Sequence, residues 1–176
     1  MGQLNPQFHD ETVIVTGGAS GIGRGVAKRF GDAGATVLIG DIREEPKNEE
    51  RPTHELIEES GGTAEFVETD VSTREDIATL VEAARDYGGV DVMVNNAGLF
   101  IGGSILDVDP DEFERIHNVN AKGIYFGTQV AANDMRDRGE PGSIVNTASI
   151  SSRYAQFEQV QNDSTQGSGR RMNRGA

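Results

Sequence analysis

A short apolar run that leads directly into a glycine-rich turn is the feature that most limits what this chain can fold into. Residues 12–16 read Thr-Val-Ile-Val-Thr and predict a buried strand. Residues 17–23 read Gly-Gly-Ala-Ser-Gly-Ile-Gly, and apolar residues then recur at helical spacing as far as Gly34. A second buried strand is expected at 36–40. Two such strands around one helix predict a βαβ unit, and therefore a parallel sheet.

The remainder of the chain repeats this alternation of strand and helix. Further strands are expected at 64–68, 90–94 and 142–147. Helices are expected near 55–60, after a capping box at 72–75, and from the N-cap Asp109 and Pro110 past Gly123 towards Arg138, with a solvated loop at 43–54. The predicted fold class is α/β: a Rossmann-like, doubly wound parallel sheet of about five strands with helices on both faces.

The composition excludes several classes of function. The 29 acidic and 16 basic residues give a net charge of −13, which disfavours nucleic acid as a partner. The chain has no cysteine, and its three histidines (His9, His54, His117) are scattered, so no metal site is predicted. No apolar stretch is long enough for a membrane span, and the N-terminus does not read as a signal peptide. We therefore expect no membrane association and a cytoplasmic location.

The charge is also unusual in kind, because only three of the 16 basic residues are lysines. An acidic, lysine-poor surface is typical of cytoplasmic proteins from salt-loving organisms, in which carboxylates keep the protein hydrated and salt screens their repulsion. An acidic protein from an ordinary environment is the alternative interpretation.

The glycine turn predicts a dinucleotide site. A turn without side chains lets backbone N–H groups approach a pyrophosphate, and the N-terminus of the next helix adds a positive dipole end. A plain tight turn is the alternative, but the preceding strand and following helix favour the site. The expected binding residues of the turn are Gly17, Ser20, Gly21, Ile22 and Gly23.

Asp41 ends the second predicted strand about 20 residues beyond the glycines. There a carboxylate accepts hydrogen bonds from the adenosine ribose and repels a 2′-phosphate, which favours NAD over NADP. Arg43 nearby softens that preference. The alternative is an acid that simply ends a strand in an acidic protein.

Two motifs together point to a known family. The sequence Thr-Gly-Gly-Ala-Ser-Gly-Ile-Gly at 16–23 with Asn-Asn-Ala-Gly at 95–98 resembles the short-chain dehydrogenases/reductases, and the resemblance spans about residues 10–166. It implies hydride transfer between a nicotinamide cofactor, NAD or less favourably NADP, and a small alcohol or carbonyl substrate. It also implies that Asp70 and Val71 flank the adenine, that Asn96, Ala97 and Gly98 line the cofactor cleft, and that Asn120 and Ser149 are catalytic.

Each of these implied roles has a simpler alternative in the residues themselves. Asp70 reads equally as a loop acid before a helix cap, and Ser149 as a loop serine with Ser151 and Ser152 after it. Asn120 reads as a polar residue within a helix, although asparagine is a poor helix former, which favours a special role.

The main departure from the family pattern lies in its Tyr-x-x-x-Lys motif. The tyrosine moves the proton and the lysine lowers its pKa, but this chain has Asn162 and Gln166 at those positions. An amide neither exchanges a proton near neutral pH nor carries a charge. Tyr154 has Glu158 four places on, and Lys122 is expected to face away from the asparagine two positions before it, so neither rebuilds the motif.

The segment after the fifth strand differs in character. We assign 1–150 to an NAD-binding Rossmann domain and 151–176 to a polar, weakly structured remnant of the active-site helix, in which Gly167 and Gly169 interrupt any helix. The chain stops at Ala176 whereas the family fold continues, so it reads as C-terminally truncated. The fifth strand is then expected to have an exposed edge that a partner or a second copy could cover.

Three hypotheses follow. The first is a short-chain NAD-dependent oxidoreductase whose activity is impaired by the two amides. The second is a catalytically inactive, NAD-binding pseudoenzyme or regulatory partner. The third, an interaction module that binds no nucleotide, is disfavoured by the glycines and by Asp41.

Overall fold

The computed structural model describes residues 7–47 and 51–172, and its centre is a five-stranded parallel sheet. The strands lie in the order β3-β2-β1-β4-β5, and each pair of neighbours is parallel. Their bounds are β1 Thr12–Thr16, β2 Thr36–Asp41, β3 Thr63–Glu68, β4 Val92–Asn95 and β5 Ser143–Asn146. The predicted fold class is confirmed.

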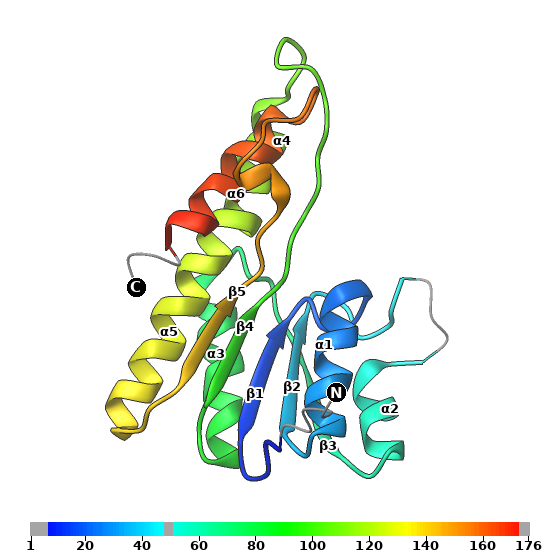
Figure 1. Cartoon of the computed structure of the whole chain (residues 1–176), viewed down its shortest axis with the longest axis vertical. Coiled ribbons are helices and arrows are strands. Elements are labelled where there is room, and N and C mark those ends of the chain that lie inside the picture. Colours follow the sequence, from blue (N-terminus) through cyan, green and yellow to red (C-terminus); the bar gives the residue numbers. More distant parts are fainter. Residues whose placement is uncertain (1–6, 48–50, 173–176) are drawn as a thin grey trace, which may run out of the picture.

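Helices cover both faces of the sheet (Figure 1). One face carries α1 (Gly21–Asp32) and α2 (Thr53–Glu59), and the other carries α3 (Arg74–Ala84) and α5 (Gly123–Arg138). Because β2 and β4 lie on opposite sides of β1, the order of the strands reverses there. In open α/β sheets ligands bind outside the carboxyl ends of the strands at such a switch point, so this reversal places the candidate site.

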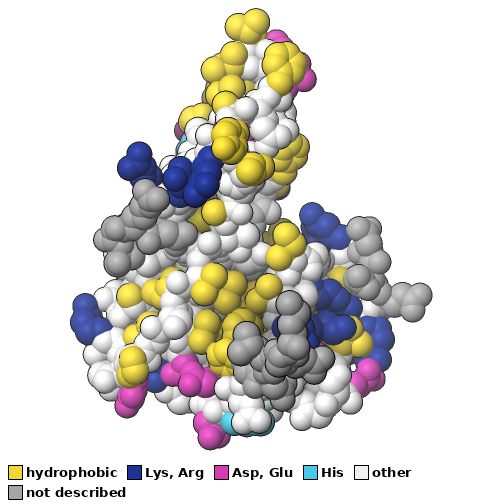
Figure 2. Space-filling model, in the orientation of Figure 1, with side chains coloured by type: hydrophobic (Ala, Val, Ile, Leu, Met, Phe, Trp, Pro, Cys, Tyr) yellow, Lys and Arg dark blue, Asp and Glu magenta, His cyan; other side chains and the backbone are white. Residues whose placement is uncertain are grey.

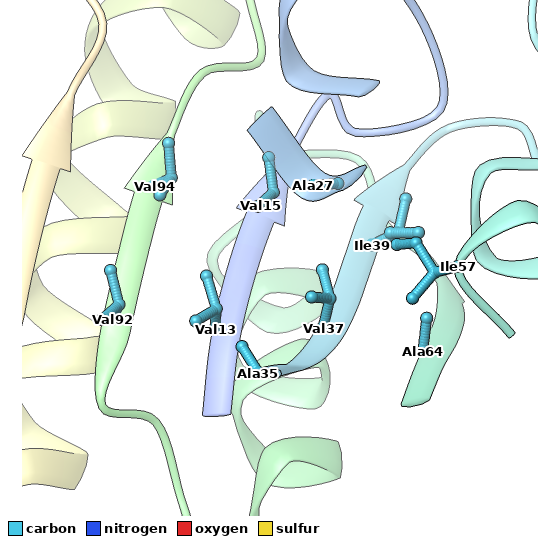
Figure 3. Packing of buried hydrophobic residues seen from close by; sticks show 10 residues of the cluster. All are labelled: Val13, Val15, Ala27, Ala35, Val37, Ile39, Ile57, Ala64, Val92 and Val94. Atoms are coloured by element: carbon cyan, nitrogen blue, oxygen red, sulfur yellow. The ribbon is translucent and has the colours of Figure 1, made fainter. Parts of the chain in front are cut away.

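The hydrophobic core forms two layers, one on each side of the sheet. Alternate residues of the central strands point to opposite faces, as the period of a strand requires. One face presents Val13 and Val15 of β1 to Ala27 of α1 (Figure 3). The other face presents Ile14 of β1 to Leu80 of α3. The continuous apolar run of β1 is therefore explained by burial on both faces.

An arm rises beyond the carboxyl ends of the strands (Figure 1). It contains α4 (Pro110–His117) and α6 (Val160–Met172), and the π-helical turn Asn118–Lys122 joins α4 to α5. Figure 2 shows hydrophobic side chains along this arm and over the middle of the sheet. The exposed ones on the arm include Phe100, Leu106, Phe113, Ile150, Tyr154 and Phe157. β5 is an edge of the sheet, and Val145 on it is 51% exposed.

Two helix starts test the predicted caps. Asp109 is the N-cap of α4, because its Oδ1 accepts the Asp111 N–H at 2.8 Å, and Pro110 is the first helical residue as predicted. The capping box at 72–75 is wrong by one residue. Thr73 is the N-cap of α3, and its hydroxyl accepts the Asp76 N–H at 3.4 Å.

The predicted weak structure of the polar tail 151–176 is also wrong for Val160–Met172, which form α6. α6 runs through both Gly167 and Gly169, although residues 173–176 lie outside the described part of the chain. A Cβ added at Gly169 would lie 3.0 Å from Ile124 Cδ1, so this glycine lets α6 approach α5 closely. The packing offsets the cost of about 1 kcal/mol that a glycine brings to a helix.

The glycine turn depends on a similarly close approach. A Cβ at Gly23 in α1 would lie 2.1 Å from the carbonyl oxygen of Gly17, and that backbone atom has no freedom to move aside. Gly25, half a turn further along the same helix, is exposed and has no atom within 4 Å of the added Cβ. The two glycines therefore differ in packing while sharing one helix.

We predict that Gly23→Ala lowers the free energy of unfolding by about 1–3 kcal/mol, because the turn must shift to admit the methyl group. The matched variant Gly25→Ala should raise it by up to about 1 kcal/mol, since alanine is the better helix former. Urea unfolding followed by circular dichroism measures both. Equal effects in the two variants would contradict the packing argument.

Far from the cleft, a buried carboxylate fastens α5 to the sheet. Asp134 accepts hydrogen bonds from the Val90 N–H (3.1 Å), Arg85 Nε (3.0 Å) and Arg138 Nε (3.0 Å). Burial opposes ionisation, but these donors outweigh it and hold the pKa of Asp134 below its usual value. Arg138 also donates to the Val90 carbonyl oxygen, so the network joins α5 to the chain that enters β4.

We predict that Asp134→Asn lowers the free energy of unfolding by about 2–4 kcal/mol at pH 7, because it removes the buried carboxylate that Arg85 and Arg138 share and leaves each arginine only its second, more exposed partner, Glu82 or Asp91. A lowered carboxyl pKa contributes stability that is present above the ordinary carboxyl pKa and is lost as the pH falls through the lowered one. The difference in free energy of unfolding between wild type and variant should therefore narrow below about pH 4. Thermal unfolding across pH measures it, with the exposed Asp137→Asn as control. A gap independent of pH would count against this account.

Candidate functional site

A cleft of about 850 Å³ lies at the switch point of the sheet. It is bordered by the glycine turn, the ends of β2 and β4, the loop after β3, and one side of α4. Of the residues predicted to bind the cofactor, all but Gly23 line it: Gly17, Ser20, Gly21, Ile22, Asp41, Asp70, Val71, Asn96, Ala97 and Gly98. Gly23 is buried behind the turn and supports its shape.

The turn needs glycine for two separate reasons. Gly17 and Gly21 have φ of +66° and +57°, in the left-handed region that favours glycine. A Cβ at Gly17 would also lie 2.8 Å from Ala97 Cα, whereas one at Gly21 would meet nothing within 4 Å. Gly17 therefore permits contact between two loops, and Gly21 permits the backbone conformation that begins α1.

Asp41 binds the glycine turn as well as facing the cleft. Its Oδ2 accepts the Ala19 N–H at 3.1 Å. This bond fixes the carboxylate at the end of β2 and leaves its other oxygen for a ligand. Arg43 also lines the cleft, close to Asp41 in the chain. At the end where the adenosine was predicted, the cleft thus brings together the held carboxylate of Asp41 and the nearby Arg43.

The Asn-Asn-Ala-Gly segment is locked to β1 by a residue that the sequence analysis did not single out. Thr16 Oγ1 accepts the N–H groups of Asn96 (3.0 Å) and Ala97 (3.1 Å). In return, Asn96 Nδ2 donates to the carbonyl oxygens of Thr16 (3.0 Å) and Gly17 (3.3 Å). A threonine at the end of a buried strand, directly before the turn, was the available signal.

Asp70 and Val71 both border the cleft, and the adenine contact expected of them stays a prediction. Asp70 Oδ1 accepts the Ser72 N–H at 2.9 Å, as a loop acid would, and the residue also borders the cleft. Val71 is buried, and a Cβ at Gly123 would lie 3.0 Å from its Cγ2. The two residues therefore shape the wall of the cleft and also join the loop to α3 and α5.

Asn120 lies within the π-helical turn and is buried. Its Oδ1 accepts the Leu99 N–H at 2.8 Å, and its Nδ2 donates to the Leu99 carbonyl (2.9 Å) and to Thr165 Oγ1 (3.1 Å). One side chain thus connects the loop after β4 to α6. π-helical turns are frequent at functional sites. Lys122 is exposed and lies on a different face from Asn120, as predicted.

Among the residues expected to be catalytic, those that follow β5 include no side chain that can serve as the proton donor. Ser149 follows β5 and caps the turn Ile150–Ser152, with its Oγ accepting the Ser151 N–H at 3.2 Å. Asn162 in α6 is only 6% exposed, and Gln166 is half-buried one turn later. Tyr154 is 65% exposed on the arm.

A contact between His117 and Ser164, also not predicted, joins α4 to α6. His117 Nε2 lies 3.1 Å from Ser164 Oγ, and its Nδ1 lies 2.8 Å from the Phe113 carbonyl oxygen.

Within residues 7–47 and 51–172, no group of three or more histidines and carboxylates is placed to hold a metal ion. In the same ranges no helix has the length and apolar character needed to cross a membrane.

Known proteins are similar to this chain in sequence and in fold. A family model described as short chain dehydrogenase matches residues 11–165. The 3beta-hydroxysteroid dehydrogenase 2 of Eggerthella lenta is 38% identical over 149 residues, which are 84% of this chain and 56% of that protein. The L-2,3-butanediol dehydrogenase of Corynebacterium glutamicum is 36% identical over 143 residues, 80% of this chain and 54% of that protein.

Solved structures agree with these relatives. A short chain dehydrogenase from Mycobacterium smegmatis superimposes with a TM-score of 0.88 at 30% identity, covering 95% of this chain and 70% of that one. The chain spans about half the length of the curated relatives it matches. The match of the family model over most of the chain, the sequence relatives and the shared fold together show that this chain belongs to the short-chain dehydrogenase family.

Proposed function

We propose that this chain binds NAD in the cleft and belongs to an oxidoreductase that transfers hydride between the nicotinamide and a small alcohol or carbonyl compound, with impaired transfer in this chain. The single observation that carries the proposal is the joint position of the glycine turn and Asp41 on one cleft at the switch point. Residues 1–150 form the NAD-binding domain in this proposal.

The residues present fit a dinucleotide. The turn has no side chain at Gly17 or Gly21, and α1 directs its N-terminus, with the backbone N–H groups of its first turn, to the same place. The free oxygen of Asp41 is the acceptor for the ribose hydroxyls. Its negative charge disfavours a 2′-phosphate, which supports NAD over NADP, while Arg43 reduces the difference.

The proposed reaction assigns separate tasks to the chain. NAD, when bound, supplies the carbon that accepts or donates hydride. Ser149 is the residue proposed to bind the substrate oxygen, and Asn120 positions α6 beside the loop after β4. Asn162 and Gln166 contribute no proton and no positive charge. Loss of a positioned general acid lowers a rate by about 10²–10⁴.

An NAD-binding pseudoenzyme or regulatory partner is the second candidate. The observation that favours it is specific: Asn162 is buried at the position of the expected proton donor, and the exposed Tyr154 does not replace it. The dehydrogenase and reductase relatives support a small-molecule substrate rather than identifying one. A cytoplasmic location and a homo-oligomeric state remain parts of the proposal, supported by the acidic composition and by the exposed edge strand β5.

We predict that calorimetric titration shows saturable NAD binding, at least about tenfold tighter than NADP, which corresponds to about 1.4 kcal/mol. Asp41→Asn should reduce that ratio, because the amide keeps an acceptor for the Ala19 N–H but removes the charge that repels the 2′-phosphate. Asp137→Asn makes the same charge change on the exposed face of α5 and should leave both affinities unchanged. Absence of NAD binding, or a preference for NADP in the wild type, would refute the cofactor assignment.

We predict that Asn162→Tyr combined with Gln166→Lys raises the oxidation rate of secondary alcohols by about tenfold or more, because the pair restores a proton donor and a neighbouring cation. The matched control is Asn162→Phe with Gln166→Lys, which supplies the ring and the charge without the hydroxyl. NADH formation measured by absorbance separates them. Wild-type turnover equal to that of an ordinary dehydrogenase would overturn the proposed impairment.

A further inference from the structure

We infer that Thr53, with Arg24 behind it, is a positioning residue that orients the glycine turn for the diphosphate of the nucleotide. The inference rests on the proposed function, since it assumes a nucleotide in the cleft. Thr53 is the first residue of α2 and lies 35 positions from Gly18 in the chain. It belongs to the segment 43–54 that the sequence analysis assigned to a solvated loop.

The contacts of Thr53 are made in a buried environment. Its Oγ1 lies 3.0 Å from the Gly18 carbonyl oxygen and 3.2 Å from that of Ala19. Arg24 Nη1 donates to the same Oγ1 at 3.1 Å and to the Arg51 carbonyl oxygen at 2.8 Å. Thr53 is 1% exposed and Arg24 is 7% exposed. The turn is therefore attached to the start of α2 from inside the protein.

The direction of the threonine proton follows from its partners. A guanidinium has donors and no acceptor, so Arg24 occupies a lone pair of the hydroxyl. The single proton of Thr53 is then left for the two turn carbonyls, which share it. A hydroxyl held in this way binds both carbonyl oxygens on the side of the turn that faces α2.

Peptide planarity carries this constraint across to the cleft. In a trans peptide the C=O and the N–H point in opposite directions. The peptide between Gly18 and Ala19 is held at both ends, because its oxygen binds Thr53 and its N–H binds Asp41 at 3.1 Å. The next peptide has its oxygen on Thr53, so the Ser20 N–H is directed away from α2, and Ser20 lines the cleft. Thr53 thus orients a donor for the diphosphate.

A second contact from the same segment holds the side chain of Ser20. The Lys47 N–H donates to Ser20 Oγ at 3.0 Å, and Lys47 itself lines the cleft. The prediction of a solvated loop is therefore wrong at Thr53, which is buried and begins α2, whereas the chain from Arg43 to Lys47 is mostly exposed and lies outside any helix or strand, as predicted. A purely structural role for Thr53, joining α2 to α1, would change stability without changing the preference for a diphosphate.

The experiment compares Thr53→Val, Thr53→Ser and Thr12→Val in the full chain. Valine keeps the shape and removes the hydroxyl, whereas serine keeps the hydroxyl. Thr12 is the matched control, because it is also 1% exposed and its hydroxyl donates to a backbone carbonyl, that of Tyr87 at 3.0 Å, outside the cleft. Dissociation constants for NAD, ADP and adenosine are measured by calorimetry, and melting temperatures are recorded alongside.

Thr53→Val should weaken NAD and ADP binding by about fivefold to tenfold, the effect of one lost hydrogen bond, and should change adenosine binding less than twofold. Thr53→Ser should restore the diphosphate affinities, and Thr12→Val should lower only the melting temperature. In the unmodified chain, ADP but not adenosine should shift the amide NMR signals of both Ser20 and Thr53, a measurement that does not require any variant to fold.

Other results would overturn the inference. Equal losses of ADP and adenosine affinity, or unchanged ADP affinity in Thr53→Val, would show that Thr53 acts only on stability. If Thr53→Val does not fold, identical amide shifts with ADP and adenosine would reject the inference instead. Failure of the wild-type chain to bind NAD would refute the proposed function itself. In contrast, a wild type and a Thr53→Val variant that bind NAD equally would refute only the role of Thr53.

Discussion

The close contact between the glycine turn and the loop after β4 is the constraint on which the rest of the structure depends. Gly17 must lack a side chain because Ala97 lies where its Cβ would be. Thr16 then holds that loop with one hydroxyl, which accepts two backbone N–H groups. Because β1 and β4 are fixed at this point, the cleft that lies where the strand order reverses has a defined shape.

The parts of the structure predicted from sequence are those in which local pattern and tertiary demand agree. β1 is apolar throughout and is buried on both faces, so pattern and burial give the same answer. The N-cap Asp109 acts on its own helix and needs no distant partner. Most of the residues that line the cleft could be named in advance, because glycine conformation and a strand-end acid are local signals.

The parts of the structure that were predicted wrongly depend instead on contacts between residues far apart in the sequence. α6 tolerates Gly169 because Ile124 lies against it, and that contact joins residues 45 positions apart. Segment 43–54 reads as solvated because its charged residues and prolines are typical of loops, yet Thr53 binds a backbone carbonyl of the turn and the Lys47 N–H donates to Ser20 Oγ. The hydrogen bonds of Thr16 were missed for the same reason, since its partners lie 80 and 81 positions away and only its place at the end of a buried strand pointed to it. Long-range hydrogen bonds from single polar residues leave no periodic trace in a sequence.

The structure also separates the support of the site from its chemistry. Asn120 reaches α6 through Thr165, and this contact requires neither a tyrosine nor a lysine in that helix. α6 can therefore remain docked while Asn162 and Gln166 occupy the positions of the proton-transfer pair. The glycine turn is held by a separate set of contacts, from Thr53 and Asp41. Because different hydrogen bonds maintain the glycine turn and the docking of α6, amides at positions 162 and 166 leave in place the interactions that shape the proposed nucleotide site.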